Sequence, residues 1–473
     1  MAAMGGGGGG KDGGGGMAAQ AGRLGVVASV AFNLAALAFY LRRRYFGGDA
    51  AAAAARKAEA EVAPSSGKPP VTKDSIINLD HGDPTMYEAF WRGGAGERAT
   101  IVIPGWQTMS YFSDVGSLCW FLEPGFEREV RRLHRLVGNA VADGYHVLVG
   151  TGSTQLFQAA LYALSPPGPS APMSVVSPAP YYSSYPAVTD FLKSGLYRWA
   201  GDAKMFDGDT YVELVCSPSN PDGGIREAVL KSGDGVAVHD LAYYWPQYTP
   251  ITSAAAHDIM LFTVSKCTGH AGTRLGWVHT NFVPNHLKFE QILAQCDWFF
   301  WHRWALVKDR AVAQKMSKFI ELNTIGVSKD SQLRAAKILK AITDGYDRAP
   351  AAAVAGDDDD DSSSRLFHFA RRKMVSRWAK LRAAVAASGI FTLPDELPGH
   401  CTFANETVSA YPPFAWLRCG KEGVDDLEGY LRERKIISRG GGKFGADGRV
   451  VRISMLDTDE AFAIFVDRLA AMN

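Results

Sequence analysis

The chain has few cysteines and almost no excess of charge, and each shortage argues against a class of protein. None of its six cysteines is spaced as a CxxC or CxxxxH motif. A disulfide framework and a zinc site are therefore not expected, and a reducing compartment is the default. The net charge of +1 at pH 7 provides no clustered positive excess to neutralise phosphates, so nucleic acid is not an expected partner. The cysteines are Cys119, Cys216, Cys267, Cys296, Cys401 and Cys419.

The N-terminal region is rich in Gly and Ala over residues 1–22, which predicts a disordered tail. Residues 24–41 then form an apolar run in which Asn33 is the one strongly polar residue. At 1.5 Å per residue this run reaches about 27 Å as a helix, enough to cross a thin bilayer. The arginines at 42–44 follow it, whereas a secretory signal would carry its positive charge before the apolar run. We therefore predict a membrane anchor over residues 23–44, with the following chain in the cytosol.

Alternating strand and helix signals begin after a flexible linker at 45–72. The expected strands are short, continuous apolar runs, as is typical of a parallel sheet buried on both faces. They alternate with helical stretches such as Thr154–Leu164, which predicts an α/β fold with a large doubly wound domain. The pattern after about residue 310 predicts a smaller α+β domain with strands at Phe414–Arg418 and Val450–Ile453. The strands expected in the large domain are His146–Val149, Ser174–Val176, Tyr211–Val215, Gly235–Val238, Met260–Val264 and Leu275–His279.

The segment richest in reactive residue types is TVSKCTGHAGTRLGW, which starts at Thr263 and contains Lys266 and Arg274. Lys266 follows a predicted strand and is expected in a short polar loop, at the edge of the sheet where α/β proteins bind ligands. A lysine that attacks a carbonyl carbon must be partly neutral, so it needs burial or a neighbouring cation to lower its pKa. Arg274 can supply that charge and can grip a phosphate through two hydrogen bonds.

Three more segments follow predicted strands. GTGSTQL at 150–156 opens a helix, and its small residues let backbone N–H groups approach an anion. SPSNPDG at 217–223 has the composition of a turn, and its Asn220 can donate to an anionic oxygen. Asp240 ends a strand, where a carboxylate can hold a pyridine nitrogen protonated, and Tyr243 lies three residues further on. Each segment alone is weak, but their order along the chain is hard to produce by chance.

These residues resemble the fold-type I pyridoxal-phosphate enzymes, and within them the alliinase and tryptophan aminotransferase family. The most specific match is SKCTGHAGTRLGW, and the resemblance covers residues 75–473. It implies pyridoxal 5′-phosphate as cofactor, with Lys266 as the lysine that binds its aldehyde as a Schiff base and Asp240 as partner of its ring nitrogen. Asn220 and Tyr243 would bind its phenolate oxygen. The residues that would hold its phosphate are Ser153, Thr154, Thr263 and Arg274.

Other positions carry over from the same resemblance. Arg452 in VVRISML would bind the α-carboxylate of the substrate. Tyr111 in SYFS would reach the cofactor phosphate of a second subunit, which implies a homodimer. One aromatic of PYYSSY would stack on the cofactor ring, and the usual P-x-Y-x-x-Y spacing favours Tyr182 over Tyr181.

The resemblance also implies a domain order and a branch of the family. Lyases of the family carry a cysteine-rich module before the catalytic domain, but residues 1–72 contain no cysteine. This favours the plant aminotransferase branch, whose longer members have a membrane segment, so we expect an anchor in the endoplasmic reticulum. The expected units are a tail (1–22), an anchor (23–44), a linker (45–72), an arm and part of the small domain (73–120), a cofactor-binding large domain (121–310) and a small domain (311–473) with a disordered acidic insertion (349–364).

For this branch, the resemblance implies transamination of L-tryptophan, and of other aromatic amino acids, to indole-3-pyruvate in auxin biosynthesis. A 2-oxo acid such as pyruvate would accept the amino group, and Lys266 would act as general base on the Cα proton. A carbon–sulfur lyase of the alliinase type would use the same residues on S-alkyl-cysteine sulfoxides, and the motifs do not separate the two reactions. A non-catalytic scaffold that kept the fold is the third reading, although every named cofactor position holds a competent residue.

Overall fold

The computed structural model describes residues 70–473, except 167, 169–170, 232, 275, 281–308, 348–364 and 397; of 276–280 it describes the backbone. The predicted tail, anchor, most of the linker and the acidic insertion lie outside the described residues. None of the helices in the described part of the chain is long and apolar enough to span a membrane. Pro70–Asn473 form one unit, which contains two larger sheets.

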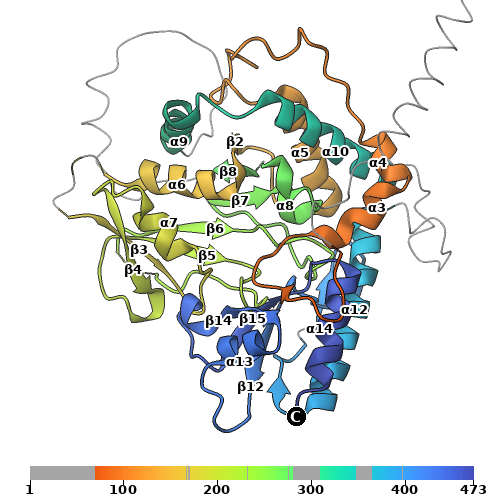
Figure 1. The fold of residues 1–473 in the computed structure, drawn as a ribbon. Helices are drawn as coiled ribbons and strands as arrows, with labels where there is room; N and C mark the ends of the chain where they lie inside the picture. The colour runs from red at the N-terminus through yellow and green to blue at the C-terminus, as the bar shows by residue number, and fades with distance from the viewer. Residues whose placement is uncertain are drawn as a thin grey trace, which may run out of the picture. The chain divides into compact units, whose positions relative to one another are not determined.

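The larger sheet has seven strands (Figure 1). One strand, β8, runs antiparallel to both of its neighbours, and the other neighbouring strands run parallel. The prediction of a mostly parallel α/β sheet is therefore confirmed. Six of these strands were predicted from the sequence, and β4 was not. In spatial order the strands are β2 (His146–Gly150), β8 (Gly276–Thr280), β7 (Ile259–Thr263), β6 (Val236–Asp240), β5 (Tyr211–Cys216), β3 (Met173–Ser177) and β4 (Tyr197–Asp202).

Helices pack around this sheet, and two of them lie beyond the boundary predicted at residue 310. α9 packs on α6, and α10 packs on α5 (Figure 1). The buried face of α9 consists of apolar side chains such as Met316 and Ile320, which explains why it joins the large sheet layer. The helices that follow residue 310 thus pack on helices of the predicted large domain, and the boundary at residue 310 stays a prediction. The helices are α5 (Pro124–Val137), α6 (Gly152–Leu164), α7 (Tyr185–Phe191), α8 (Val264–Cys267), α9 (Arg310–Thr324) and α10 (Lys329–Asp347).

The smaller sheet has four antiparallel strands in the order β14-β15-β12-β9. The helices α12 and α14 pack against each other beside it (Figure 1). The strands predicted at Phe414–Arg418 and Val450–Ile453 are β12 and β15. These elements are β9 (Phe391–Thr392), β12 (Phe414–Cys419), β14 (Arg439–Gly440), β15 (Val450–Ser454), α12 (Leu366–Ser388), α13 (Leu427–Glu433) and α14 (Asp459–Ala470), with a hairpin of β10 (Pro398–Cys401) and β11 (Glu406–Ser409).

The N-terminal part of the described chain runs along the small sheet. Its strand β1 (Ile77–Asn78) pairs in parallel with β13 (Ile436–Ile437), and the amide of Ser454 donates to the carbonyl of Leu79 at 3.0 Å. Ile77 and Leu79 are fully buried, so apolar burial fixes the path of this segment. The residues that follow, 80–83, are thereby brought over the carboxyl edge of the large sheet. The short helices α3 (Glu88–Arg92) and α4 (Gly94–Arg98) come next.

Candidate active site

The strand register of the large sheet brings the predicted residues to one edge. Asp240 is the last residue of β6, Lys266 follows β7, and Asn220 follows β5. Gly276, which starts β8, pairs with Gly150 on one side and with Thr263 on the other. The turn after β2 therefore lies beside the segment that carries Lys266. Because parallel strands end at the same edge, residues distant in sequence converge there.

Lys266 lies in the four-residue helix α8 and not in the predicted polar loop. The helix is capped by Thr263, whose hydroxyl accepts from the amide of Ser265 at 3.2 Å. The Nζ of Lys266 donates to the carbonyl of Gly82 at 2.7 Å and lies 5.9 Å from the centroid of the Tyr243 ring. Burial, together with the positive charges of Arg452 and Arg274, lowers the pKa of Lys266 from 10.5 to about 8, and Asp83 opposes part of this shift. The amine is therefore partly neutral near physiological pH.

Asp240 faces the same region and is held by two donors. The hydroxyl of Tyr185 donates to its Oδ2 at 3.0 Å, and the amide of Ala242 donates to its Oδ1 at 3.2 Å. Burial raises the pKa of Asp240, and both hydrogen bonds oppose that rise. A cation that approached this carboxylate would be strongly attracted to it. Tyr185 was not among the predicted residues, although it is the last tyrosine of the P-x-Y-x-x-Y spacing that favours Tyr182 as the stacking residue.

Asn220 and Arg452 are hydrogen-bonded to each other across the two sheets. The Nη1 of Arg452 donates to Oδ1 of Asn220 at 2.9 Å, and its Nη2 donates to the carbonyl of Asp80. This leaves the amide nitrogen of Asn220 as the donor for an oxygen of a bound group. The Nε of Arg452 is buried without a hydrogen-bond partner in the described part of the chain. A buried, incompletely satisfied guanidinium is suited to bind a carboxylate.

Three of the predicted phosphate-binding residues lie where α6 begins. Arg274 lies against the first residue of that helix: a Cβ built on Gly152 would be 2.7 Å from the Nη2 of Arg274. Gly152 has a φ of +78°, which an L side chain rarely adopts. Ser153 and Thr154 occupy the first turn of α6, where unpaired backbone N–H groups and the helix dipole favour negative charge. The structure thus brings Ser153, Thr154 and Arg274, three of the residues predicted to hold a phosphate, to the same end of α6.

The tyrosines of the PYYSSY segment point to different neighbours. The Tyr181 ring packs edge-on against Trp199, with ring centroids 4.9 Å apart. The Tyr182 ring packs edge-on against Tyr185 at 5.3 Å, and Tyr185 in turn bonds Asp240. Tyr182 is therefore connected to Asp240 through Tyr185, whereas Tyr181 contacts Trp199.

Tyr111 is the predicted residue that the structure leaves apart from the others. Its side chain is 69% exposed, and it lines a hollow with residues of 324–330 rather than with Lys266. This position is compatible with contact to a second subunit.

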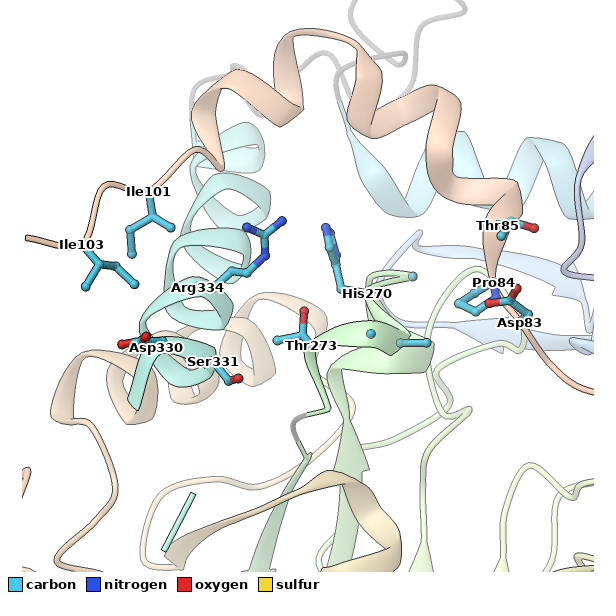
Figure 2. A pocket seen from close by; sticks show the side chains of 13 residues that line it. Asp83, Pro84, Thr85, Ile101, Ile103, His270, Thr273, Asp330, Ser331 and Arg334 are labelled. Atoms are coloured by element: carbon cyan, nitrogen blue, oxygen red, sulfur yellow. The ribbon is translucent and has the colours of Figure 1, made fainter. Parts of the chain in front are cut away.

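A hollow of about 660 Å³ borders the site (Figure 2). Asp83 lines it and also lies close enough to Lys266 to oppose the lowering of that lysine's pKa. The side chains of His270 and Arg334 point toward each other across part of the hollow (Figure 2). Burial and the charge of Arg334 together lower the pKa of His270 to about 4, so His270 is neutral at physiological pH.

Comparison with known proteins places the chain among plant relatives. The family model described as allinase matches residues 77–286 and 302–473. Tryptophan aminotransferase-related protein 1 of Oryza sativa subsp. japonica is 91% identical over 457 residues, 97% of each chain. Tryptophan aminotransferase-related protein 2 of Arabidopsis thaliana is 50% identical, over 84% of this chain and 82% of that one.

More distant similarities concern a lyase and the fold. Alliin lyase 1 of Allium sativum is 32% identical over 80% of this chain and 72% of its own length. A solved structure of an aminotransferase from Staphylococcus aureus has a TM-score of 0.53 at 16% identity and covers 87% of this chain and 97% of that chain. At this identity the likeness concerns the fold alone.

Proposed function

Because the chain belongs to the alliinase family, we propose that it is an aminotransferase that converts L-tryptophan, and other aromatic amino acids, to indole-3-pyruvate. The amino acceptor would be a 2-oxo acid such as pyruvate, and the product would serve auxin biosynthesis. The 91% identity to a protein named tryptophan aminotransferase-related supports the choice of substrate. The observation that carries the reaction class is the placement of Lys266, a lysine with a lowered pKa that feels the charge of Arg452, directly after the strand that pairs with the Asp240 strand.

Pyridoxal phosphate is the cofactor of this family, and the residues present fit it. The N-terminus of α6 and Arg274 form an anion site that suits its phosphate, and the space beside Gly152 is filled by Arg274 alone. Asp240 suits its ring nitrogen, and the amide of Asn220 with the hydroxyl of Tyr243 suits its phenolate oxygen. When bound, the cofactor supplies an electron sink for the negative charge left on Cα after proton removal.

The chain's own residues then have separate tasks. Arg452 binds the α-carboxylate of the substrate and so orients its Cα–H bond. Lys266, neutral in part because of its lowered pKa, takes the Cα proton as general base. Asp240, with Tyr185 and Ala242 holding its carboxylate, keeps a proton on the ring nitrogen. Tyr182 would stack on the ring. The packing of Tyr182 against Tyr185 supports Tyr182 over Tyr181, because Tyr181 packs on Trp199 instead.

The test uses purified protein comprising residues 70–473, loaded with pyridoxal phosphate. A panel of amino acids and 2-oxo acids with product identification should give indole-3-pyruvate from tryptophan and pyruvate, and Lys266→Ala should abolish turnover. Borohydride reduction and peptide mapping should place the covalent label on Lys266. A label on another lysine would sink the proposal.

A lyase of the alliinase type is the second candidate, because alliin lyase 1 is 32% identical. It would use the same proton removal by Lys266 and then expel a sulfur leaving group from Cβ. Steady release of pyruvate from an S-alkyl-cysteine sulfoxide, without any added 2-oxo acid, would favour the lyase over the aminotransferase.

We also propose a homodimer in which Tyr111 reaches the phosphate site of the second subunit. The segment around Tyr111 supports it, because large apolar side chains there are exposed in the part of the chain that the structure describes. Exposed apolar patches of this kind mark interaction surfaces. The residues are Val102, Trp106, Met109, Tyr111, Phe112 and Val115, between 55% and 82% exposed.

The anchor at 23–44 is likewise proposed, in the endoplasmic reticulum membrane with the catalytic part facing the cytosol. The order of the apolar run and the arginines at 42–44 supports it. The full chain should remain in the membrane pellet after a carbonate wash, whereas residues 70–473 should be released. Release of the full chain would contradict the anchor.

A further inference from the structure

Two arginines lie directly opposite each other on neighbouring strands of the small sheet. In the antiparallel pair β14–β15, the Cα of Arg439 is the register partner of the Cα of Arg452. Side chains at directly opposed positions point to the same face of a sheet. Arg452 is the residue that binds the α-carboxylate in the proposed function, so Arg439 is a second cation beside the same substrate site. Like charges in this arrangement destabilise a sheet unless an anion compensates them.

Asp80 is that anion, and it contacts both arginines. Its carboxylate accepts from Nε of Arg439 at 2.5 Å and from Nη2 of Arg439 at 3.0 Å. Its backbone carbonyl accepts from Nη2 of Arg452. Ser183 also contacts Arg439, because its hydroxyl accepts a hydrogen bond from Nη1 of Arg439 at 2.9 Å.

The surrounding charges are mostly positive. Burial alone would raise the pKa of Asp80, but the hydrogen bond and charge of Arg439, with Arg452 and Lys443, bring it below its ordinary value. Lys443 is itself paired with Glu428 at 2.8 Å. Asp80 is therefore ionised at physiological pH, and the charge it cancels directly is that of Arg439.

The Asp80–Arg439 pair is partly exposed, so a ligand can reach it. The side chains of Arg439 and Asp80 are 26% and 28% exposed, whereas Arg452 is 3% exposed. Tyr182, the proposed ring-stacking residue, lies close enough to Arg439 to contribute to the raised pKa of that arginine. Arg439 thus lies at the wall of the substrate site and not in the protein interior.

We infer that the Asp80–Arg439 pair determines the charge specificity of the substrate site. Asp80 cancels the charge of Arg439, so a second carboxylate on a substrate does not find Arg439 free and meets the carboxylate of Asp80 instead. The site consequently takes amino and 2-oxo acids with uncharged side chains and rejects glutamate, aspartate and 2-oxoglutarate. This inference rests on the proposed function, because it takes Arg452 as the α-carboxylate site.

The decisive variant is Asp80→Asn in the enzyme loaded with pyridoxal phosphate. The amide oxygen of asparagine can still accept a hydrogen bond from Arg439 but leaves its charge uncancelled. Glutarate serves as an unreactive dicarboxylate probe, and its binding is measured by calorimetry. We expect the variant to bind glutarate about tenfold more tightly than the natural enzyme, the gain typical of a charge-assisted, two-point carboxylate contact. The ratio of kcat/KM for 2-oxoglutarate to that for pyruvate should rise in the same direction.

Two controls assign the gain to Arg439. The double variant Asp80→Asn with Arg439→Gln should lose it, because no free cation remains. Asp447→Asn breaks the pair with Arg418 at 2.8 Å, in which both side chains are about half exposed, and it should leave glutarate binding unchanged. A gain that persists without Arg439, or no gain in Asp80→Asn, overturns the inference.

Arg439→Gln alone keeps the test decisive if Asp80→Asn does not fold. It leaves the charge of Asp80 uncompensated beside Arg452, where it competes with the substrate carboxylate. The KM for tryptophan should rise several-fold while kcat changes little, and an unchanged KM contradicts the inference. If the natural enzyme does not transaminate tryptophan at all, the proposed function fails, but glutarate binding still decides the role of the pair.

Discussion

Two residues of the candidate site, Asp240 and Lys266, have pKa values that are shifted from their ordinary ones. Burial raises the pKa of Asp240 and lowers that of Lys266, so each shift favours the neutral form. Two hydrogen bonds to Asp240, one of them from Tyr185, partly offset the rise of its pKa. A cofactor with a protonated ring nitrogen and a carbonyl carbon would complement both residues.

Tyr185→Phe should destabilise the cofactor-free protein by about 1.5–3 kcal/mol, the typical loss when a buried hydrogen bond to a charged group is removed. The Asp240 carboxylate loses its 3.0 Å donor, and its pKa rises further. Urea unfolding measures the change. Tyr162→Phe is the matched control, because Tyr162 is 38% exposed. Equal effects of the two substitutions would show that the Asp240 contact is unimportant.

Lys266 should make the stability of the cofactor-free protein depend on pH. Its pKa falls from 10.5 in the unfolded chain to about 8 in the folded protein. Between these values the unfolded chain binds more protons, so the free energy of unfolding rises with pH across this window. Below it both states are protonated, and the contribution is constant. Compared with Lys266→Met, the natural protein should gain stability from pH 8 to pH 10 in urea titrations; parallel curves would contradict this.

At the scale of elements, the antiparallel strand β8 brings the two halves of the site together. It lies between β2 and β7, and its first residue, Gly276, pairs with Gly150 and Thr263. Arg274, just before β8, is therefore carried to the N-terminus of α6. The anion site is thus a product of strand order and not of one continuous motif.

Gly152→Ala should weaken pyridoxal-phosphate binding at least about tenfold, because displacing Arg274 removes charge-assisted hydrogen bonds to the phosphate. Its new Cβ would lie 2.7 Å from Nη2 of Arg274. Gly144→Ala is the control: its φ of +82° is similarly strained, but nothing lies within 4 Å of its Cβ. Fluorescence titration of the cofactor-free proteins compares them. Similar affinities would exclude the crowding of Arg274 as the cause.

At the scale of the whole molecule, the apolar segment around Tyr111 should form the dimer contact. Met109→Ser should raise the dimer dissociation constant about tenfold or more, as expected for a buried interface side chain. Met205→Ser is the matched control, because Met109 and Met205 are both 82% exposed. Sedimentation equilibrium measures both. A protein that is monomeric at all concentrations, or equal effects of the two variants, would refute the proposed interface.

The sequence alone determined the sheet strands and the order of the chemical segments. Short β-branched runs predict buried parallel strands, and six of the seven were placed within two residues. The missed strand, β4 (Tyr197–Asp202), alternates polar and apolar residues at the sheet edge and contains a glycine, so it lacks a continuous apolar run. The local sequence pattern was sufficient to predict strands that are buried on both faces, because such strands need a continuous apolar run.

Tertiary structure alone decided which residues complete the site. Tyr185 reaches Asp240 over 55 positions, and Asp80 reaches Arg439 and Arg452 over more than 350. It also placed Lys266 in a helical turn and assigned α9 to the large sheet layer. These outcomes depend on strand register and on the packing of distant apolar faces. Local propensity and spacing carry no information about either, because both are settled only when the two sheets assemble.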